Sequence, residues 1–246
     1  SNWLVLNDLL SILKLAEPKL QSDRSMEFKS EIELKNLSFS YASNEKMVLK
    51  NINLTIDRGE KVAIIGQSGS GKSTLLDVIM GLLSPSEGEM TVDGVKIDDT
   101  NRKSWMSSIA HVPQSINLVD RSVSENIAFG IKPALASPDR LRSAAYHAHL
   151  SEVIENLPHK YASRIGERGS LLSGGQVQRL GIARALYQDP EILVFDEATS
   201  SLDLKTEKLI MDTISLYKGF KTMIIISHRI ENLSFCDEII KLNDKN

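Results

Sequence analysis

A glycine-rich segment at residues 66–73 constrains the fold of this chain more than any other feature of its sequence. It reads Gly-Gln-Ser-Gly-Ser-Gly-Lys-Ser and fits the phosphate-binding loop pattern at every fixed position. The pattern predicts a buried strand before it, at residues 62–65, and an apolar helix after it, from Leu75 to Leu83. A strand, a loop and a helix in this order are the context that such a loop requires. The segment therefore predicts an α/β fold.

The residue types in this loop suit a bound polyphosphate better than a plain flexible turn. Glycines let the backbone curl, so that successive N–H groups and the positive end of the next helix point at a β-phosphate. Lys72 supplies a point charge for the β- and γ-phosphates, and Ser73 offers a hydroxyl to Mg²⁺. The predicted contacts from this segment are Gly66, Gln67, Ser68, Gly69, Ser70, Gly71, Lys72, Ser73 and Thr74.

Two acidic residues follow a second buried strand, at residues 192–195. Alone, Asp196 and Glu197 could be a polar strand end with no further role. Paired with a phosphate loop, Asp196 is expected to hold the Mg²⁺ shell and Glu197 to polarise the water that attacks the γ-phosphate. Leaving group, metal and nucleophile are then all accounted for.

The rest of the chain predicts a second sheet and a helical stretch. Apolar residues recur at a period near two from Glu31 to Ile56, which is typical of antiparallel strands, and Asp93-Gly94 predicts a tight hairpin. Residues 3–15 carry one apolar stripe of an amphipathic helix, and residues 17–29 are polar and aperiodic like a linker. A further buried strand is expected at residues 223–226.

Composition excludes several other functions. The 29 basic and 32 acidic residues give a net charge of -3, so no basic footprint for nucleic acid is present. No apolar run approaches the ~18 residues of a membrane span. The single cysteine, Cys236, stands among apolar neighbours and is expected to be a buried small hydrophobe in a reducing compartment rather than a nucleophile.

A third motif points to a family. The Ser-Gly-Gly turn at 173–175, followed by a helical run, predicts a second helix N-terminus able to bind an anion. Together with other motifs in this order, it makes the chain resemble the nucleotide-binding domain of ABC transporters from about Glu31 to its C-terminus. The residues that carry the resemblance are the phosphate loop, Gln114, Leu172-Ser173-Gly174-Gly175-Gln176, Asp196-Glu197, Ser200-Ser201-Leu202-Asp203 and His228.

The resemblance implies roles for residues at matching positions. Tyr41 matches the aromatic that stacks on adenine, and Val48 falls among the nucleotide-binding residues. Gln114 matches the glutamine that contacts Mg²⁺ and couples the nucleotide site to the membrane domains. His228 matches the histidine that contacts the γ-phosphate, so the catalytic set becomes Lys72, Gln114, Glu197 and His228.

The same resemblance implies that a single chain holds two half-sites. Asp203 matches the acid that crosses to the opposite subunit, and Ser173, Gly174, Gly175 and Gln176 match the segment that closes over the ATP of a partner ATPase domain. In the family a basic residue usually follows this segment, but this chain has Val177 at that position. The difference puts in doubt only an auxiliary contact. A full catalytic set in one chain makes a homodimer self-sufficient.

The implied fold is a RecA-like P-loop NTPase core, with strands near 62–65, 109–112, 192–195 and 223–226. An antiparallel β subdomain precedes the core, and an α-helical signature subdomain is expected at about 120–183. Residues 1–30 are expected to lead in from a transmembrane domain fused upstream, and residues 31–246 to form the ATPase domain.

Residues 165–169 resemble the exporter segment that faces the membrane loops, and parts of the chain resemble flippases of lipid-linked oligosaccharides. The implied location is the cytoplasmic face of the inner (plasma) membrane.

Two other classes were weighed against a transporter ATPase. A soluble ABC ATPase acting on nucleic acid or ribosomes would show a long coiled-coil insertion or two ATPase units in one chain, and neither is present. A phosphate-loop kinase or GTPase would leave Gln114 and Ser173 without a purpose.

Overall fold

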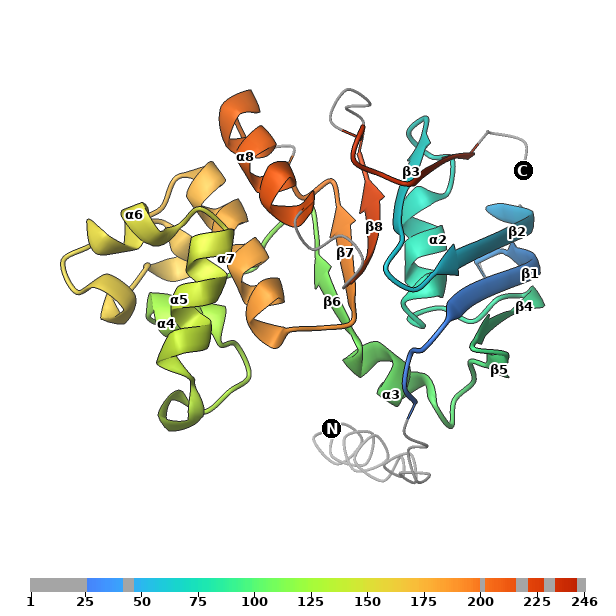
Figure 1. Cartoon of the computed structure of the whole chain (residues 1–246), viewed down its shortest axis with the longest axis horizontal. Coiled ribbons are helices and arrows are strands. Elements are labelled where there is room, and N and C mark those ends of the chain that lie inside the picture. Colours follow the sequence, from blue (N-terminus) through green and yellow to red (C-terminus); the bar gives the residue numbers. More distant parts are fainter. Residues whose placement is uncertain (1–25, 42–46, 200–201, 216–220, 228–232, 243–246) are drawn as a thin grey trace, which may run out of the picture.

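A five-stranded parallel sheet forms the centre of the protein (Figure 1). The computed structural model describes residues 26–41, 47–199, 202–215, 221–227 and 233–242, so the expected helix at 3–15 lies outside the described residues. The strand order is β6-β7-β8-β3-β9, and every neighbouring pair is parallel. The strands are β3 (Lys61–Gly66), β6 (Ile109–Val112), β7 (Ile192–Asp196), β8 (Thr222–Ile226) and β9 (Glu238–Leu242).

Both faces of the sheet are buried at its inner strands β7 and β8, which explains the unbroken apolar runs of these strands. In β7, Leu193 and Phe195 belong to one apolar core, whereas Ile192 and Val194 belong to another on the opposite face. Parallel strands read as continuous apolar runs because each side is covered. The four strands predicted for the core are confirmed.

The sequence did not reveal β9, which lies at the edge of the sheet beside β3. Charged Glu238 and Lys241 interrupt its apolar run, and Ile239 is 45% exposed. Only Ile239 and Ile240 stand together as apolar residues between these charges, a run too short to predict a strand.

The predicted antiparallel subdomain is confirmed as a four-stranded sheet of order β2-β1-β4-β5. The Asp93-Gly94 hairpin joins Val92 to Val95, and its two residues have φ values of +51° and +75°. Positive φ at both positions is typical of the two-residue turn that the sequence predicted. The strands are β1 (Glu31–Phe39), β2 (Leu49–Asp57), β4 (Glu87–Val92) and β5 (Val95–Lys96).

The helices divide between the sheets and a separate lobe, seen on the left of Figure 1. The lobe contains α4 (Val123–Ile127), α5 (Pro138–His147), α6 (Ser151–Glu155) and the beginning of α7 (Gly174–Gln188), with short 3-10 turns at 133–135, 160–162 and 167–169. Helix α7 packs against α4, α5 and strand β6, so it connects the lobe with the parallel sheet. The remaining helices are α2 (Lys72–Ile79), α3 (Arg102–Ser107) and α8 (Leu204–Ser215).

Helix α2 ends at Ile79, before the predicted end at Leu83. Gly81 has φ +78°, and Leu82 N–H donates to the Asp77 carbonyl. This left-handed cap ends the helix while the apolar run continues. In the described parts of the chain, no helix has the length and apolarity to cross a membrane.

The hairpin also anchors the chain where it enters the domain. The Asp93 carboxylate accepts hydrogen bonds from the backbone N–H groups of Lys29, Ser30 and Glu31, at 2.7, 2.7 and 2.9 Å. These backbone donors keep the pKa of the Asp93 carboxyl below its ordinary value, although partial burial opposes them. The start of β1 is therefore fixed by one side chain of the hairpin.

Asp93→Asn is expected to lower the free energy of unfolding by about 2 kcal/mol, because an amide cannot accept all three bonds. Stability from a depressed carboxyl pKa is present above the unfolded pKa and is lost as pH falls through the folded one. The difference from wild type should therefore shrink below about pH 4. Urea unfolding across pH measures it, with Asp99→Asn, an exposed ion-pair residue, as the control. An equal loss in both variants would contradict the anchoring role.

Candidate nucleotide-binding site

The glycine-rich loop joins β3 to α2 and leaves the N-terminus of that helix open. Gly71 precedes the helix with φ +92°, and no side chain caps the first turn. The first turn also carries no acidic residue. Its N–H groups and the positive end of the helix therefore remain available to an anion, as the sequence predicted for a polyphosphate.

Lys72 is held at the loop by the backbone. Its ammonium donates hydrogen bonds to the carbonyls of Gly66 and Gln67, at 2.9 and 2.8 Å. The side chain is buried, and the two carbonyls are neutral partners. The loop thus curls around its own lysine, which carries a positive charge beside the open helix end.

A cavity of about 230 Å³ lies over this loop and is lined by Val48, Ser68, Gly69, Gly71, Lys72, Ser73, Thr74 and Glu197. Seven of these eight were predicted to bind nucleotide and Glu197 to activate water. Tyr41 lies beside the loop, since its hydroxyl is 3.2 Å from Thr74 Oγ1. Tyr41 is 42% exposed and makes a T-shaped contact with Phe39, with ring centroids 4.9 Å apart.

The predicted acids lie at the carboxyl end of β7. Asp196 is the last residue of that strand, and Glu197 follows it with φ +50°, its N–H bonded to the Ile226 carbonyl of β8. Gln114, just beyond β6, donates from Nε2 to Glu197 Oε2 at 2.9 Å. The structure therefore brings Gln114 and Glu197 together, although 83 residues separate them.

The electrostatics of Asp196 favour a positively charged neighbour. Burial raises the pKa of its carboxyl, nearby His111 opposes that rise, and the charge of Glu197 adds to it. Sequence analysis did not single out His111. Its position on β6, one strand from Asp196 and near Gln114 in the chain, was the available signal.

These side chains fit a magnesium ion. Ser73, Gln114 and Asp196 provide hydroxyl, amide and carboxylate oxygens, the hard ligands that Mg²⁺ prefers. The described residues contain no group of three or more His, Cys, Asp or Glu able to hold a metal. With a single carboxylate among Ser73, Gln114 and Asp196, these residues suit Mg²⁺ bound through few protein ligands, water and substrate phosphates, rather than by an all-protein cage.

The signature segment, which is residues 172–176, forms a second helix N-terminus away from this cavity. Ser173 Oγ accepts from Gln176 N–H at 3.3 Å, and Gln176 Oε1 accepts from Ser173 N–H at 2.9 Å, a reciprocal capping box. Ser173 and Gly174 are exposed. None of residues 173–176 lines the cavity over the phosphate loop.

Of the two remaining predicted site residues, the structure describes Asp203 but not His228. Asp203 caps the start of α8, accepting from Thr206 N–H at 3.0 Å, and this bonding lowers the pKa of its carboxyl. Its side chain is exposed. His228 lies outside the described residues, as do Ser200 and Ser201 of the motif before Asp203.

A parallel sheet with a glycine-rich loop, its lysine and a strand-end glutamate around one cavity defines a P-loop nucleotide-binding protein. Comparison with known proteins narrows the class: residues 49–200 match the family described as ABC transporter. The chain belongs to this family, as an exporter-type ATPase domain that binds ATP.

Similar proteins occur in bacteria and in humans. The chain is 37% identical over 215 residues to the ATP-dependent lipid A-core flippase of Haemophilus influenzae, covering 87% of this chain and 36% of that protein. Human ATP-binding cassette sub-family B member 5 is 38% identical over 214 residues, which are 87% of this chain and 17% of that protein. A solved bacterial Atm1-family ABC exporter with ATP bound superposes with a TM-score of 0.87 at 31% identity, covering 97% of this chain and 42% of that one. The chain thus spans about a third or less of these curated relatives.

Alanine substitutions at two glycines of the loop would cause similar backbone strain but different steric overlap. A Cβ at Gly71 would lie 2.9 Å from Leu49 Cδ2 and 3.1 Å from the Val48 carbonyl oxygen, whereas a Cβ at Gly69 would meet nothing within 4 Å. Both glycines have positive φ, so alanine at either position also costs about 1 to 2 kcal/mol in the backbone.

Gly71→Ala is therefore expected to weaken binding of a fluorescent ATP analogue at least about tenfold more than Gly69→Ala does. Equilibrium titration of both variants measures the difference. Equal affinities would show that the overlap with Leu49 and Val48 is relieved without disturbing the loop.

Proposed function

We propose that this chain is the ATP-hydrolysing domain of an ABC exporter. Two copies of it close around two Mg-ATP molecules, and this closing and the hydrolysis that follows move a fused membrane domain. The observation that carries the catalytic part is that Glu197 shares one cavity with Lys72 and Ser73. A carboxylate opposite a phosphate cradle is placed to orient water toward a γ-phosphate.

Different residues of the chain bind the nucleotide and activate the attacking water. The open end of α2 and Lys72 hold the phosphates, while Tyr41 stacks on the base. Glu197 accepts a proton from the attacking water, and Gln114 orients the Glu197 carboxylate through their 2.9 Å hydrogen bond. His228 contacts the γ-phosphate. Mg²⁺ held by Ser73, Gln114 and Asp196 would neutralise developing phosphate charge.

A second copy completes each site. Ser173 and the following residues present an exposed helix N-terminus that takes no part in their own chain's cavity. In the proposed dimer this end closes over the γ-phosphate held by the partner, and Asp203 contacts the partner at the same interface.

The membrane part is proposed to lie outside this sequence. Relatives are far longer than the matched region, and several are named as export ATP-binding/permease proteins of Staphylococcus aureus. We assign residues 1–30 to the connection from the membrane domain and residues 31–246 to the ATPase domain, with its helical part at about 120–183. The domain then works at the cytoplasmic face of the inner (plasma) membrane. Its substrate is a lipid, lipid-linked sugar, peptide or drug, chosen by the membrane helices.

Glu197→Gln is the sharpest test of the catalytic assignment. The variant keeps the phosphate and metal contacts but loses the base, so ATP should bind without being consumed and an ATP-bound dimer should accumulate. Light scattering with saturating Mg²⁺ and ATP measures the dimer, and phosphate release measures turnover. Glu89→Gln, on the surface of β4, is the matched control and should behave as wild type.

A Glu197→Gln protein that stays monomeric, or that hydrolyses ATP at the wild-type rate, would contradict the role of Glu197.

Wild-type turnover per chain should rise with protein concentration, because each site needs two chains. Constant turnover per chain across a dilution series would contradict the shared site.

A further inference from the structure

The segment that follows Gln114 is fastened to the helical lobe. Ile116 packs against Gly181 of α7 so closely that a methyl group at Gly181 would overlap it. Leu118 is buried and lies against Gly169, just before the signature. Segment 116–122 therefore begins two residues after Gln114, which contacts Glu197, and packs against the helical lobe.

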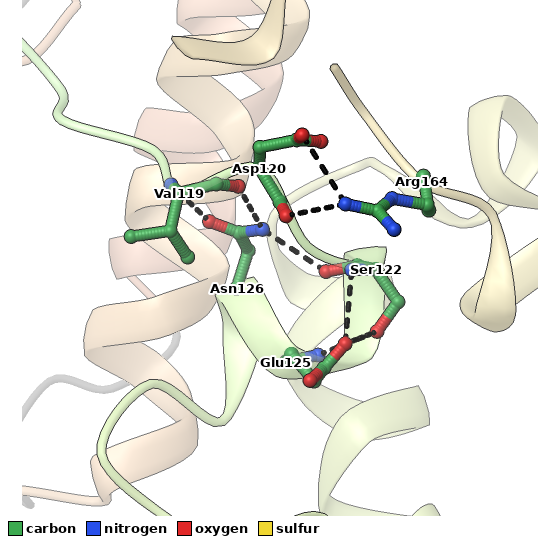
Figure 2. A network of polar contacts seen from close by, with 6 residues as sticks. All are labelled: Val119, Asp120, Ser122, Glu125, Asn126 and Arg164. Atoms are coloured by element: carbon green, nitrogen blue, oxygen red, sulfur yellow. Dashed lines mark hydrogen bonds and ion pairs between the residues drawn. The ribbon is translucent and has the colours of Figure 1, made fainter. Parts of the chain in front are cut away.

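Asn126 of α4 is the centre of this attachment (Figure 2). Its side chain is 0% exposed and bonds on both sides of the amide. Oδ1 accepts from Val119 N–H at 3.0 Å, while Nδ2 donates to the carbonyls of Val119 and Ser122, both at 3.0 Å. The Asn126 amide thus forms hydrogen bonds with both the N–H and the carbonyl of Val119, as the backbone of a neighbouring strand would.

Arg184 connects the same asparagine to α7. Its guanidinium donates to the Asn126 carbonyl at 2.9 Å, to the Asn117 carbonyl at 2.9 Å and to Asn126 Oδ1 at 3.3 Å. It also stacks over Phe129, 4.9 Å from the ring centroid. Burial lowers the pKa of this guanidinium, and every hydrogen bond just named goes to a neutral oxygen.

A third set of contacts ties the end of the segment to the residues before the signature. Arg164 donates to the carbonyl and the carboxylate of Asp120, at 3.0 and 3.2 Å (Figure 2). Ser122 and Arg164 form an antiparallel bridge, and Ile165 N–H donates to the Arg121 carbonyl. From Ile116 to Ser122, the chain is thus held by α4, by α7 and by residues 163–165.

We propose that Asn126 is a positioning residue for ATP hydrolysis: with Arg184, it joins segment 116–122 to α7, so that the position of Gln114 sets that of Ser173. The role of Ser173 in this statement rests on the proposed function. The mechanical part concerns this chain alone. When Gln114 follows Glu197 at an occupied phosphate site, the helix end at Ser173 follows with it.

Hydrogen exchange with mass spectrometry tests the mechanical part without any turnover. In Asn126→Ala without nucleotide, exchange should rise together in peptides covering 116–122 and 173–178, while peptides covering 66–74 and 223–226 stay as in wild type. Arg184→Lys keeps a positive charge but loses the planar fork that bonds Asn117 and Asn126, so it should show a smaller rise in the same two regions and covers the case in which the alanine variant does not fold.

Asn101→Ala is the matched control. Asn101 is also a buried asparagine that holds a loop backbone, with bonds to Asp98 N–H at 2.9 Å and to the Lys96 carbonyl at 2.8 Å. It lies in the β5–α3 connection, and α3 is not part of the helical lobe (Figure 1). Its loss should leave exchange in 116–122 and 173–178 unchanged.

The functional readout separates binding from turnover. Asn126→Ala should keep the affinity for a fluorescent ATP analogue within about twofold of wild type and lower kcat at least about tenfold, whereas Asn101→Ala should change kcat less than about twofold. If 116–122 loosens while 173–178 exchanges as in wild type, or if both asparagine variants lose kcat equally, the positioning role is wrong. If wild type hydrolyses no ATP, the proposed function fails instead, and the exchange comparison still decides the role of Asn126.

Discussion

The parallel alignment of the five central strands is the constraint on which the site depends. Parallel strands end at one edge of the sheet, and polar residues that follow them meet there. β3 ends at Gly66, β7 at Asp196 and β6 two residues before Gln114. The apolar runs that place these strands in one parallel sheet therefore also bring Glu197 to the cavity over the phosphate loop and Gln114 to Glu197.

The same edge holds an unusual backbone position. Glu197 has φ +50°, which a side chain other than glycine seldom adopts, and its N–H bonds to Ile226 of the neighbouring strand. The conformation aims its carboxylate at Gln114 and at the cavity lined by Lys72. A backbone held in this way by its neighbours is typical of a functional position.

Much of this organisation could be predicted from residue patterns, because it depends on short-range regularities. The phosphate loop, four buried strands and the Asp93-Gly94 hairpin each carry a local signal of apolar period or turn chemistry. The capping box of Ser173 and Gln176 also follows a readable spacing, as does a second one of Ser122 and Glu125.

Other features depend on partners distant in the chain, so they leave no local pattern. Gln114 bonds Glu197, 83 residues away, and Arg184 bonds Asn117, 67 residues away. Asn126 is polar and would be expected at the surface, yet it is fully buried because the backbone of Val119 satisfies its amide. Edge strand β9 was missed for a related reason, since charged residues interrupt its apolar run.

We propose that a complete site takes its phosphate loop from one copy and its signature segment from another. Mixing Lys72→Ala with Ser173→Trp tests it most directly, because each variant alone should be nearly inactive and their heterodimer contains one intact composite site. Phosphate release should reappear on mixing, with heterodimer formation followed in the same samples. If heterodimers form and bind one ATP, yet hydrolysis stays at the level of the separate variants, the claim is contradicted.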